Sequence, residues 1–237
     1  MKHIKEMLLI SLIVFGGVYL SAAGSFGQRD YENELRDRKV KVEDYLGKVD
    51  GVEKEFVGKY LNHEDEDPSV IVSETTNLDT GESFKYIQAR DSEKNIEIDG
   101  RLDGSIFFRK GNERYWIDTR NKTYYTDNFD YSKNPKEPSI ISINENRIYE
   151  KFLAGYDKKI EKLADGYKVT CLDDLNKGSY DIYDEDINLI ESFTDNSQGR
   201  WKEVIVSKSA DVNETYEKLL GLKDNYTRVD DLGQIKN

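Results

Sequence analysis

Residues 105–126 read SIFFRKGNERYWIDTRNKTYYT, and this stretch decides the fold. It predicts a meander of three short strands joined by two polar turns. Each strand carries two adjacent aromatic residues: Phe107 and Phe108, Tyr115 and Trp116, Tyr124 and Tyr125. Neighbouring side chains of a strand point to opposite faces, so each pair places one ring on each side of the sheet. Both faces of this sheet therefore need apolar cover.

Two kinds of cover would satisfy this pattern. Helices could pack on both faces, or one face could be a concave surface that holds an apolar ligand. The second arrangement makes all six aromatic residues candidates for lining a cavity. Which member of each pair faces inward stays open, because a shift of register by one residue reverses every assignment.

The N-terminus has the pattern of an export signal. Lys2 and Lys5 precede an apolar run at residues 7–20, and small residues that suit a signal peptidase follow at 21–25. The run predicts either a signal peptide, cut after Ala23, or a short membrane anchor at residues 1–24. In both cases the lysines keep the N-terminus in the cytoplasm, so the remainder of the chain faces outward.

Composition narrows the class of protein. The formal net charge of −12 over 237 residues argues against a nucleic-acid partner, because phosphate binding needs a clustered basic surface. A single cysteine, Cys171, excludes an intramolecular disulfide, which is ordinary for a bacterial exported protein. No linker-like composition divides residues 25–237, so we expect one domain there.

Helices are expected before, between and after the strands in the sequence. Apolar residues at helical spacing predict a helix over residues 31–57, with a break near Gly47 and Gly51. A second helix is expected at 144–155. A third begins at Asp211, with Glu214 completing a capping box. Short runs rich in β-branched and aromatic residues predict the other strands, at residues 70–75, 83–89, 95–99, 158–162, 167–172, 179–184, 189–194 and 200–206.

Catalytic constellations are nearly absent from the sequence. Outside the leader, His63 is the one histidine, and no motif supports a nucleophile at any serine or at Cys171. Cys171 stands in a strand pattern and is expected to be a small buried residue. Acidic clusters at residues 63–67 and 173–186 fit solvated turns better than a calcium loop, because their spacing is wrong for one. We therefore expect no enzyme, no metal and no cofactor.

The order of elements resembles that of the lipoprotein-carrier (LolA-like) superfamily. The resemblance rests on the hairpin RKGNERYWIDTRNKTYY at 109–125, on the strand WKEVIV at 201–206 and on LGLKDNY at 220–226. It spans most of residues 30–230. It implies an α+β fold: a strongly curved antiparallel sheet, or incomplete β-barrel, with two or three helices packed over an apolar cavity. Members of this family hold acyl chains or lipoproteins without catalysis.

Three functions stay open at this point. The first is an exported cell-envelope protein that binds lipid or lipoprotein acyl chains in an apolar cavity, as a carrier or a sensor. The second is a membrane-anchored structural or regulatory ectodomain that binds another envelope protein. The third is an envelope hydrolase or metal-dependent enzyme, which the motifs support least. The first predicts a cavity lined by one aromatic of each pair, and the second predicts a filled core with an exposed apolar patch.

Overall fold

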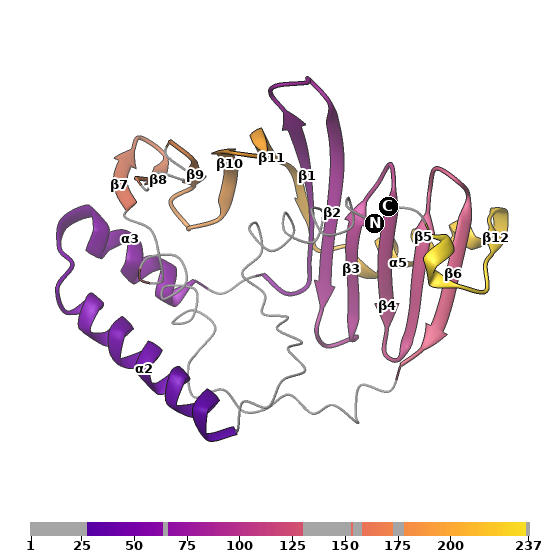
Figure 1. The fold of residues 1–237 in the computed structure, drawn as a ribbon, viewed down its shortest axis with the longest axis horizontal. Helices are drawn as coiled ribbons and strands as arrows, with labels where there is room; N and C mark the ends of the chain where they lie inside the picture. Colours follow the sequence, from indigo (N-terminus) through magenta and orange to yellow (C-terminus); the bar gives the residue numbers. More distant parts are fainter. Residues whose placement is uncertain (1–27, 64–65, 130–152, 154–157, 173–177, 236–237) are drawn as a thin grey trace.

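The computed structural model describes residues 28–63, 66–129, 153, 158–172 and 178–235 (Figure 1). Helices α2 (Gln28–Leu46) and α3 (Gly51–Asn62) come first, and α5 (Val212–Leu222) follows the long strand that ends at Ser209. Two short 3-10 helices are η3 (Lys223–Asn225) and η4 (Leu232–Gln234). The strands are β1 (Ser69–Asn77), β2 (Ser83–Asp91), β3 (Ile96–Arg101), β4 (Ser105–Lys110), β5 (Glu113–Asp118), β6 (Thr123–Asn128), β7 (Lys158–Leu163), β8 (Gly166–Cys171), β9 (Tyr180–Tyr183), β10 (Leu189–Asn196), β11 (Gly199–Ser209) and β12 (Thr227–Arg228).

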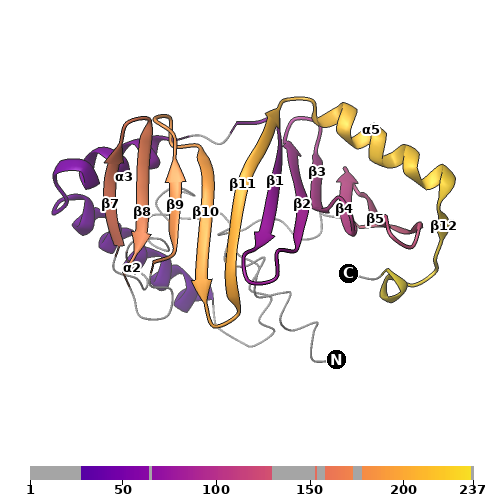
Figure 2. The same cartoon turned by 90° about the horizontal axis from the view of Figure 1, so that it is seen from above.

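All these strands form one sheet, in the order β12-β6-β5-β4-β3-β2-β1-β11-β10-β9-β8-β7. Every neighbouring pair is antiparallel except β12 with β6, which is parallel. The sheet is strongly curved and does not close: β1–β6 are seen face-on in Figure 1, whereas β7–β11 are seen face-on only from above in Figure 2. The α+β class with an unclosed, curved sheet is therefore confirmed.

The first helical stretch breaks where the glycines predict. α2 ends at Leu46, and α3 begins at Gly51, whose φ of 55° suits glycine. Val42 on α2 and Phe56 on α3 are fully buried, so the apolar stripe read from the sequence does face the core. α3 continues to Asn62, beyond the predicted end at residue 57.

Two apolar cores lie on opposite faces of the sheet. α5 packs on β1–β5, and its Val212, Tyr216 and Leu219 join the buried side chains of those strands. α2 and α3 pack on the other end, where Phe56 and Val57 meet Tyr167, Val169 and Tyr183 of β8 and β9. In Figure 1, α5 lies behind the sheet, whereas α2 and α3 lie beneath β7–β9. We refer to these faces as the α5 face and the α2/α3 face.

One detail of the sequence prediction is wrong. Asp211 is the N-cap residue of α5, but its side chain accepts no capping hydrogen bond. Glu214 pairs instead with Lys218, at 2.6 Å between carboxylate and ammonium. The ion pair to the next turn of the helix therefore replaces the predicted capping box.

Two other expectations fall on residues that the structure does not describe. These are the leader at 1–24 and the helix at 144–155, which lie outside the described residues except for Leu153. Among the described helices, none combines the length and the apolar character needed to cross a membrane.

Candidate functional site

The strand register divides the six aromatic candidates between the two faces. Phe108 pairs with Tyr115 across β4 and β5, and Tyr124 pairs with Ile117 across β5 and β6. Phe108 is fully buried, and Tyr115 and Tyr124 pack against the same core under α5. The Phe108 ring stacks on Tyr115 at 5.1 Å and meets Tyr216 of α5 edge-on at 5.5 Å. These three residues are thus part of the core on the α5 face.

The other three rings form a row on the opposite face. Phe107 pairs with Trp116, and Trp116 pairs with Tyr125, so that the rings run across β4, β5 and β6. The centroids of Phe107 and Trp116 are 5.0 Å apart, and those of Trp116 and Tyr125 are 5.6 Å apart. All three side chains are partly exposed. We call Phe107, Trp116 and Tyr125 the aromatic row.

The register also places this row on the α2/α3 face. On the far side of the sheet, Val169 of the α2/α3 core pairs with Asp181, and Asp181 pairs with Ser192. Ser192 pairs with Glu203, and Glu203 pairs with Thr75 of β1. Thr75 in turn pairs with Phe84 of β2. Alternate residues from Phe84 lead to Gln88, which pairs with Asp99, and Asp99 pairs with Phe107. Paired residues lie on the same face, and neither register shift of these strands falls within this path. The row and the α2/α3 core therefore share one face at opposite ends of the sheet.

Arginines pair with carboxylates beside the aromatic row. The Arg114 guanidinium lies 5.0 Å from the centre of the Trp116 ring, and its Nε donates to Asp127 at 2.7 Å. Arg109 Nε donates to Glu97 at 2.7 Å on the same face. A cation held over an indole ring is attracted by the negative ring face. The row is therefore an apolar strip with a charged border.

Between the row and the α2/α3 core, the same face carries a polar cluster. The Tyr86 hydroxyl donates to Asp99 at 2.8 Å, and the amide of Gln88 donates to the same carboxylate at 3.2 Å. Burial and the neighbouring Asp99 carboxylate raise the pKa of Tyr86, so its hydroxyl stays protonated. Burial also raises the pKa of Glu203, with a smaller contribution in the same direction from Asp181. The charged form of Glu203 is thus disfavoured by its low solvation.

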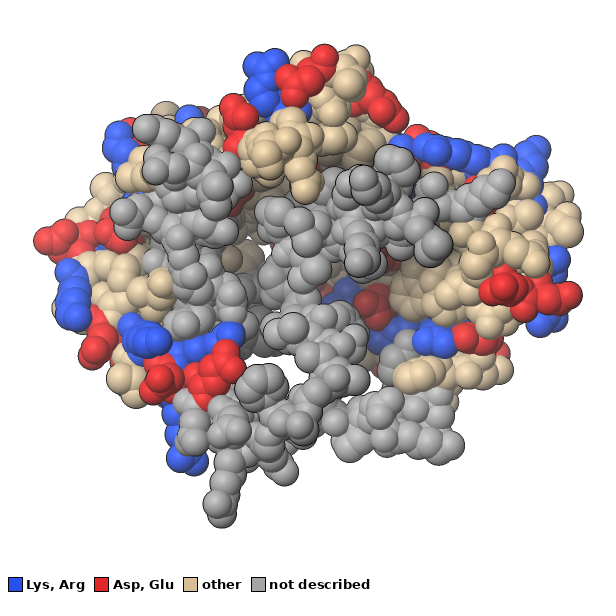
Figure 3. All heavy atoms as spheres, in the orientation of Figure 1, with Lys and Arg blue, Asp and Glu red and all other residues tan. Residues whose placement is uncertain are grey.

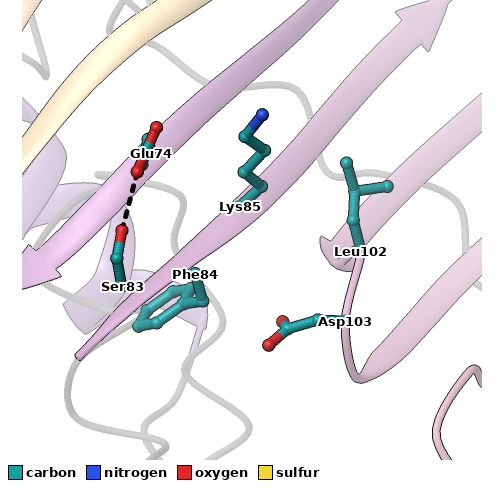
Figure 4. Close-up of a pocket in the computed structure, with 6 residues that line it drawn as sticks. All are labelled: Glu74, Ser83, Phe84, Lys85, Leu102 and Asp103. Carbon is teal, nitrogen blue, oxygen red and sulfur yellow. Dashed lines mark hydrogen bonds between the residues drawn. The ribbon is translucent and has the colours of Figure 1, made fainter.

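A separate pocket lies at the end of β1 and β2, and sequence reasoning did not identify it. It has a volume of about 340 Å³. Figure 4 shows Phe84 and Leu102 in its wall and the Ser83 hydroxyl donating to Glu74, at 2.8 Å. The residues that line it are Glu74, Ser83, Phe84, Lys85, Leu102 and Asp103. Glu74 lies on β1, the next three residues lie on β2, and Leu102 and Asp103 lie in the turn after β3, so no spacing in the sequence marks them as neighbours.

The remaining residues considered from the sequence form no site in the described part of the chain. Cys171 is buried, as expected. His63 ends α3, and the acidic cluster beside it lies partly outside the described residues, as does the cluster after residue 172. Within the described ranges, no three His, Cys, Asp or Glu side chains are placed to hold a metal ion. In the described part of the face in Figure 3, acidic and basic side chains are interspersed.

No family model and no curated protein matches the chain. Among solved structures, a distant likeness is found to the complex of MucA and MucB from Pseudomonas aeruginosa, at 10% identity and a TM-score of 0.39, over 65% of this chain and 55% of that one. A LolA superfamily protein from Nitrosomonas europaea matches at 10% identity and a TM-score of 0.26, over 68% of this chain and 94% of that one.

A putative outer membrane lipoprotein-sorting protein domain from Vibrio parahaemolyticus matches at 14% identity and a TM-score of 0.28, over 73% of this chain and all of that domain. The resemblance to the LolA-like superfamily that the sequence pattern suggests is thus found among solved structures. At these identities and TM-scores, the likeness identifies no ligand.

Proposed function

We propose that this protein is a non-enzymatic binding protein of the cell envelope whose aromatic row holds an acyl chain of a lipid or lipoprotein. One observation carries this proposal. The rings of Phe107, Trp116 and Tyr125 form a contacting, partly exposed row on the α2/α3 face. Of their sequence neighbours, Phe108 is buried in the core under α5, and Tyr115 and Tyr124 pack against that core. The row therefore lies outside the core under α5, and its rings are available to a ligand on the α2/α3 face.

The chemistry of the row suits a hydrocarbon chain. An acyl chain laid across three adjacent strands would contact all three rings in turn, because neighbouring strands are about 4.8 Å apart. Burying apolar surface contributes about 25 cal/mol per Å², so no polar group of the ligand is needed for affinity. The Arg114–Asp127 and Arg109–Glu97 pairs beside the row would remain solvated while the chain covers the rings.

The envelope location rests on the leader at residues 1–24, which predicts export, with or without retention as an anchor. The single cysteine agrees with a bacterial exported protein. No described constellation of side chains suggests catalysis, and so binding is the activity we propose.

Tryptophan fluorescence tests the proposal directly, since the chain has two tryptophans. The variant Trp201→Phe leaves Trp116 as the reporter in the row. The matched variant Trp116→Phe leaves Trp201, which lies near the start of β11 with its ring 6.4 Å from that of Phe84. Titration with dibromostearic acid should quench Trp116 strongly and Trp201 little. Equal quenching of the two, or none, would contradict acyl-chain binding at the row.

Mass spectrometry of an organic extract of the purified exported protein gives an independent test. Co-purified lipid should fall at least several-fold in Trp116→Ala. Phe193→Ala is the matched control, because Phe193 is a partly exposed ring that packs on Tyr180 at 5.2 Å, on the other face of the sheet. A lipid-free, stable wild-type protein would contradict the carrier function.

A second candidate function is binding of another envelope protein through the same row. It is favoured by the Arg114 guanidinium over Trp116, because arginine and aromatic residues are enriched at protein interfaces. A photoreactive phenylalanine placed at Tyr125 in exporting cells should then crosslink to a protein, whereas the same group at Phe193 should not. Crosslinking to lipid alone would favour the acyl-chain function.

A further inference from the structure

The two edges of the sheet differ in the residues that protect them. β7 forms one edge, and three of its six residues are lysines, in the sequence KKIEKL. Charged residues, lysine above all, prevent an edge strand from pairing with another chain. Near the other edge, β6 reads TYYTDN, which contains two tyrosines and two threonines but no lysine or arginine. The β6 edge therefore lacks the lysines that protect the β7 edge, and its one charged residue, Asp127, is paired with Arg114 of β5.

A short segment of the chain already pairs with part of the β6 edge. β12 runs parallel to β6 and aligns with Thr123 and Tyr124. The N–H of Thr227 donates to the carbonyl of Lys122, and the N–H of Val229 donates to that of Tyr124, both at 2.9 Å. The chain then leaves the sheet and forms η4. The edge thus accepts an extended strand, and among the described residues β12 covers only part of its length.

The alternating direction of the backbone groups along β6 shows which N–H and C=O groups at this edge β12 does not cover. Lys122 and Tyr124 direct their carbonyls outward to β12, whereas the N–H of Phe129 donates inward to Asn112, at 2.9 Å. Backbone groups of successive residues in a strand point to opposite sides, so those of Thr126 and Asn128 point outward. No described residue forms a backbone hydrogen bond with them at this edge. Within the described ranges, the open part of the edge begins directly after the part that β12 covers.

We infer that the edge of β6 at Thr126 and Asn128 is a strand-addition site for an extended peptide segment of a partner protein. Only a peptide backbone repeats donors and acceptors at the spacing of this edge, which a lipid chain cannot match. The outermost ring of the aromatic row, Tyr125, lies on β6 itself, so an added strand would place an apolar side chain beside it. The site uses backbone groups and does not depend on acyl-chain binding by the row.

Peptides selected from a phage-displayed library of random dodecamers on the full chain provide the probe. A selected peptide, labelled with fluorescein, is then methylated at one backbone nitrogen at a time. Strand addition predicts a period of two: methylation at alternate positions weakens binding at least tenfold, and methylation at the positions between changes it less than about twofold. The absence of any selected peptide, or a scan without this alternation, would overturn the inference.

Variants of the protein, in place of variants of the peptide, test the same site. Thr126→Pro removes the outward N–H and should weaken peptide binding at least tenfold, whereas Thr126→Val keeps the N–H and should leave affinity within about twofold. If Thr126→Pro does not fold, hydrogen exchange of the wild-type protein tests the site instead. The amides of Thr126 and Asn128 should exchange rapidly in the free protein and become protected at least tenfold by the peptide. Protection in the free protein, or none on binding, would contradict the site.

Discussion

The ring of Phe107 lies 5.0 Å from that of Trp116 on one face of the sheet, while the adjacent Phe108 is fully buried on the other face. Two consecutive residues of the same type thus differ in their surroundings alone. Phe108 belongs to the core under α5, and Phe107 belongs to the partly exposed aromatic row. This pair allows the two faces to be tested separately.

Truncation of the two phenylalanines should have unequal effects on stability. Phe108→Ala removes a ring that packs on Tyr115 and Tyr216, and should lower the free energy of unfolding by about 3–5 kcal/mol. Phe107→Ala should cost about 1 kcal/mol, because solvent already reaches that ring. Denaturant unfolding of both variants measures the difference. Equal losses would show that the row is part of the folding core.

Gly166 at the start of β8 should tolerate no side chain. Its φ is 147°, and an added Cβ would collide with the backbone carbonyl of Tyr183 on β9. Gly166→Ala should therefore destabilise the protein by more than about 2 kcal/mol, from unfavourable φ and from displacement of β9. Gly81→Ala is the matched control: its φ is 74° and it has open space around it, so it should cost only about 1–2 kcal/mol. Similar thermal shifts for the two variants would contradict the close approach.

The half-buried carboxyl of Glu203 should make stability depend on pH. Burial raises its pKa in the folded protein, so the folded state holds this proton more tightly than the unfolded state. The resulting stabilisation is present below the ordinary glutamate pKa and is lost as the pH rises through the raised value. Glu203→Gln should therefore raise Tm at pH 8 by about 2–4 °C, with little change at pH 4. A larger gain at pH 4 than at pH 8 would contradict this account.

Asp118 should be needed for the turn between β5 and β6. Its side chain is fully buried and accepts from the backbone N–H of Arg120 at 3.0 Å and of Asn121 at 2.9 Å. Asp118→Ala leaves those donors without this acceptor and should cost about 1–3 kcal/mol. Because the turn sets the register of β6, Trp116 fluorescence should also change, whereas Asp186→Ala, in an exposed turn, should affect neither. An unchanged unfolding midpoint for Asp118→Ala would contradict this role.

The sequence by itself determined the strands of the meander, the break between α2 and α3, and the α+β class. These features depend on local chemistry: alternation in strands, helical spacing of apolar residues, and the cost of glycine within a helix. It also determined that each aromatic pair is split between two faces, because neighbouring side chains of a strand always point to opposite sides.

The tertiary structure alone decided which member of each pair is buried. That assignment depends on pairing between distant segments, including the irregularity between Val72 and Ser73, where the register of β1 with β11 shifts. A one-residue shift exchanges every inward side chain for an outward one, and no local pattern excludes it. The parallel pairing of β12 with β6 and the placement of the helices on opposite faces are likewise contacts between residues far apart in the chain. Their energies arise only when those segments meet.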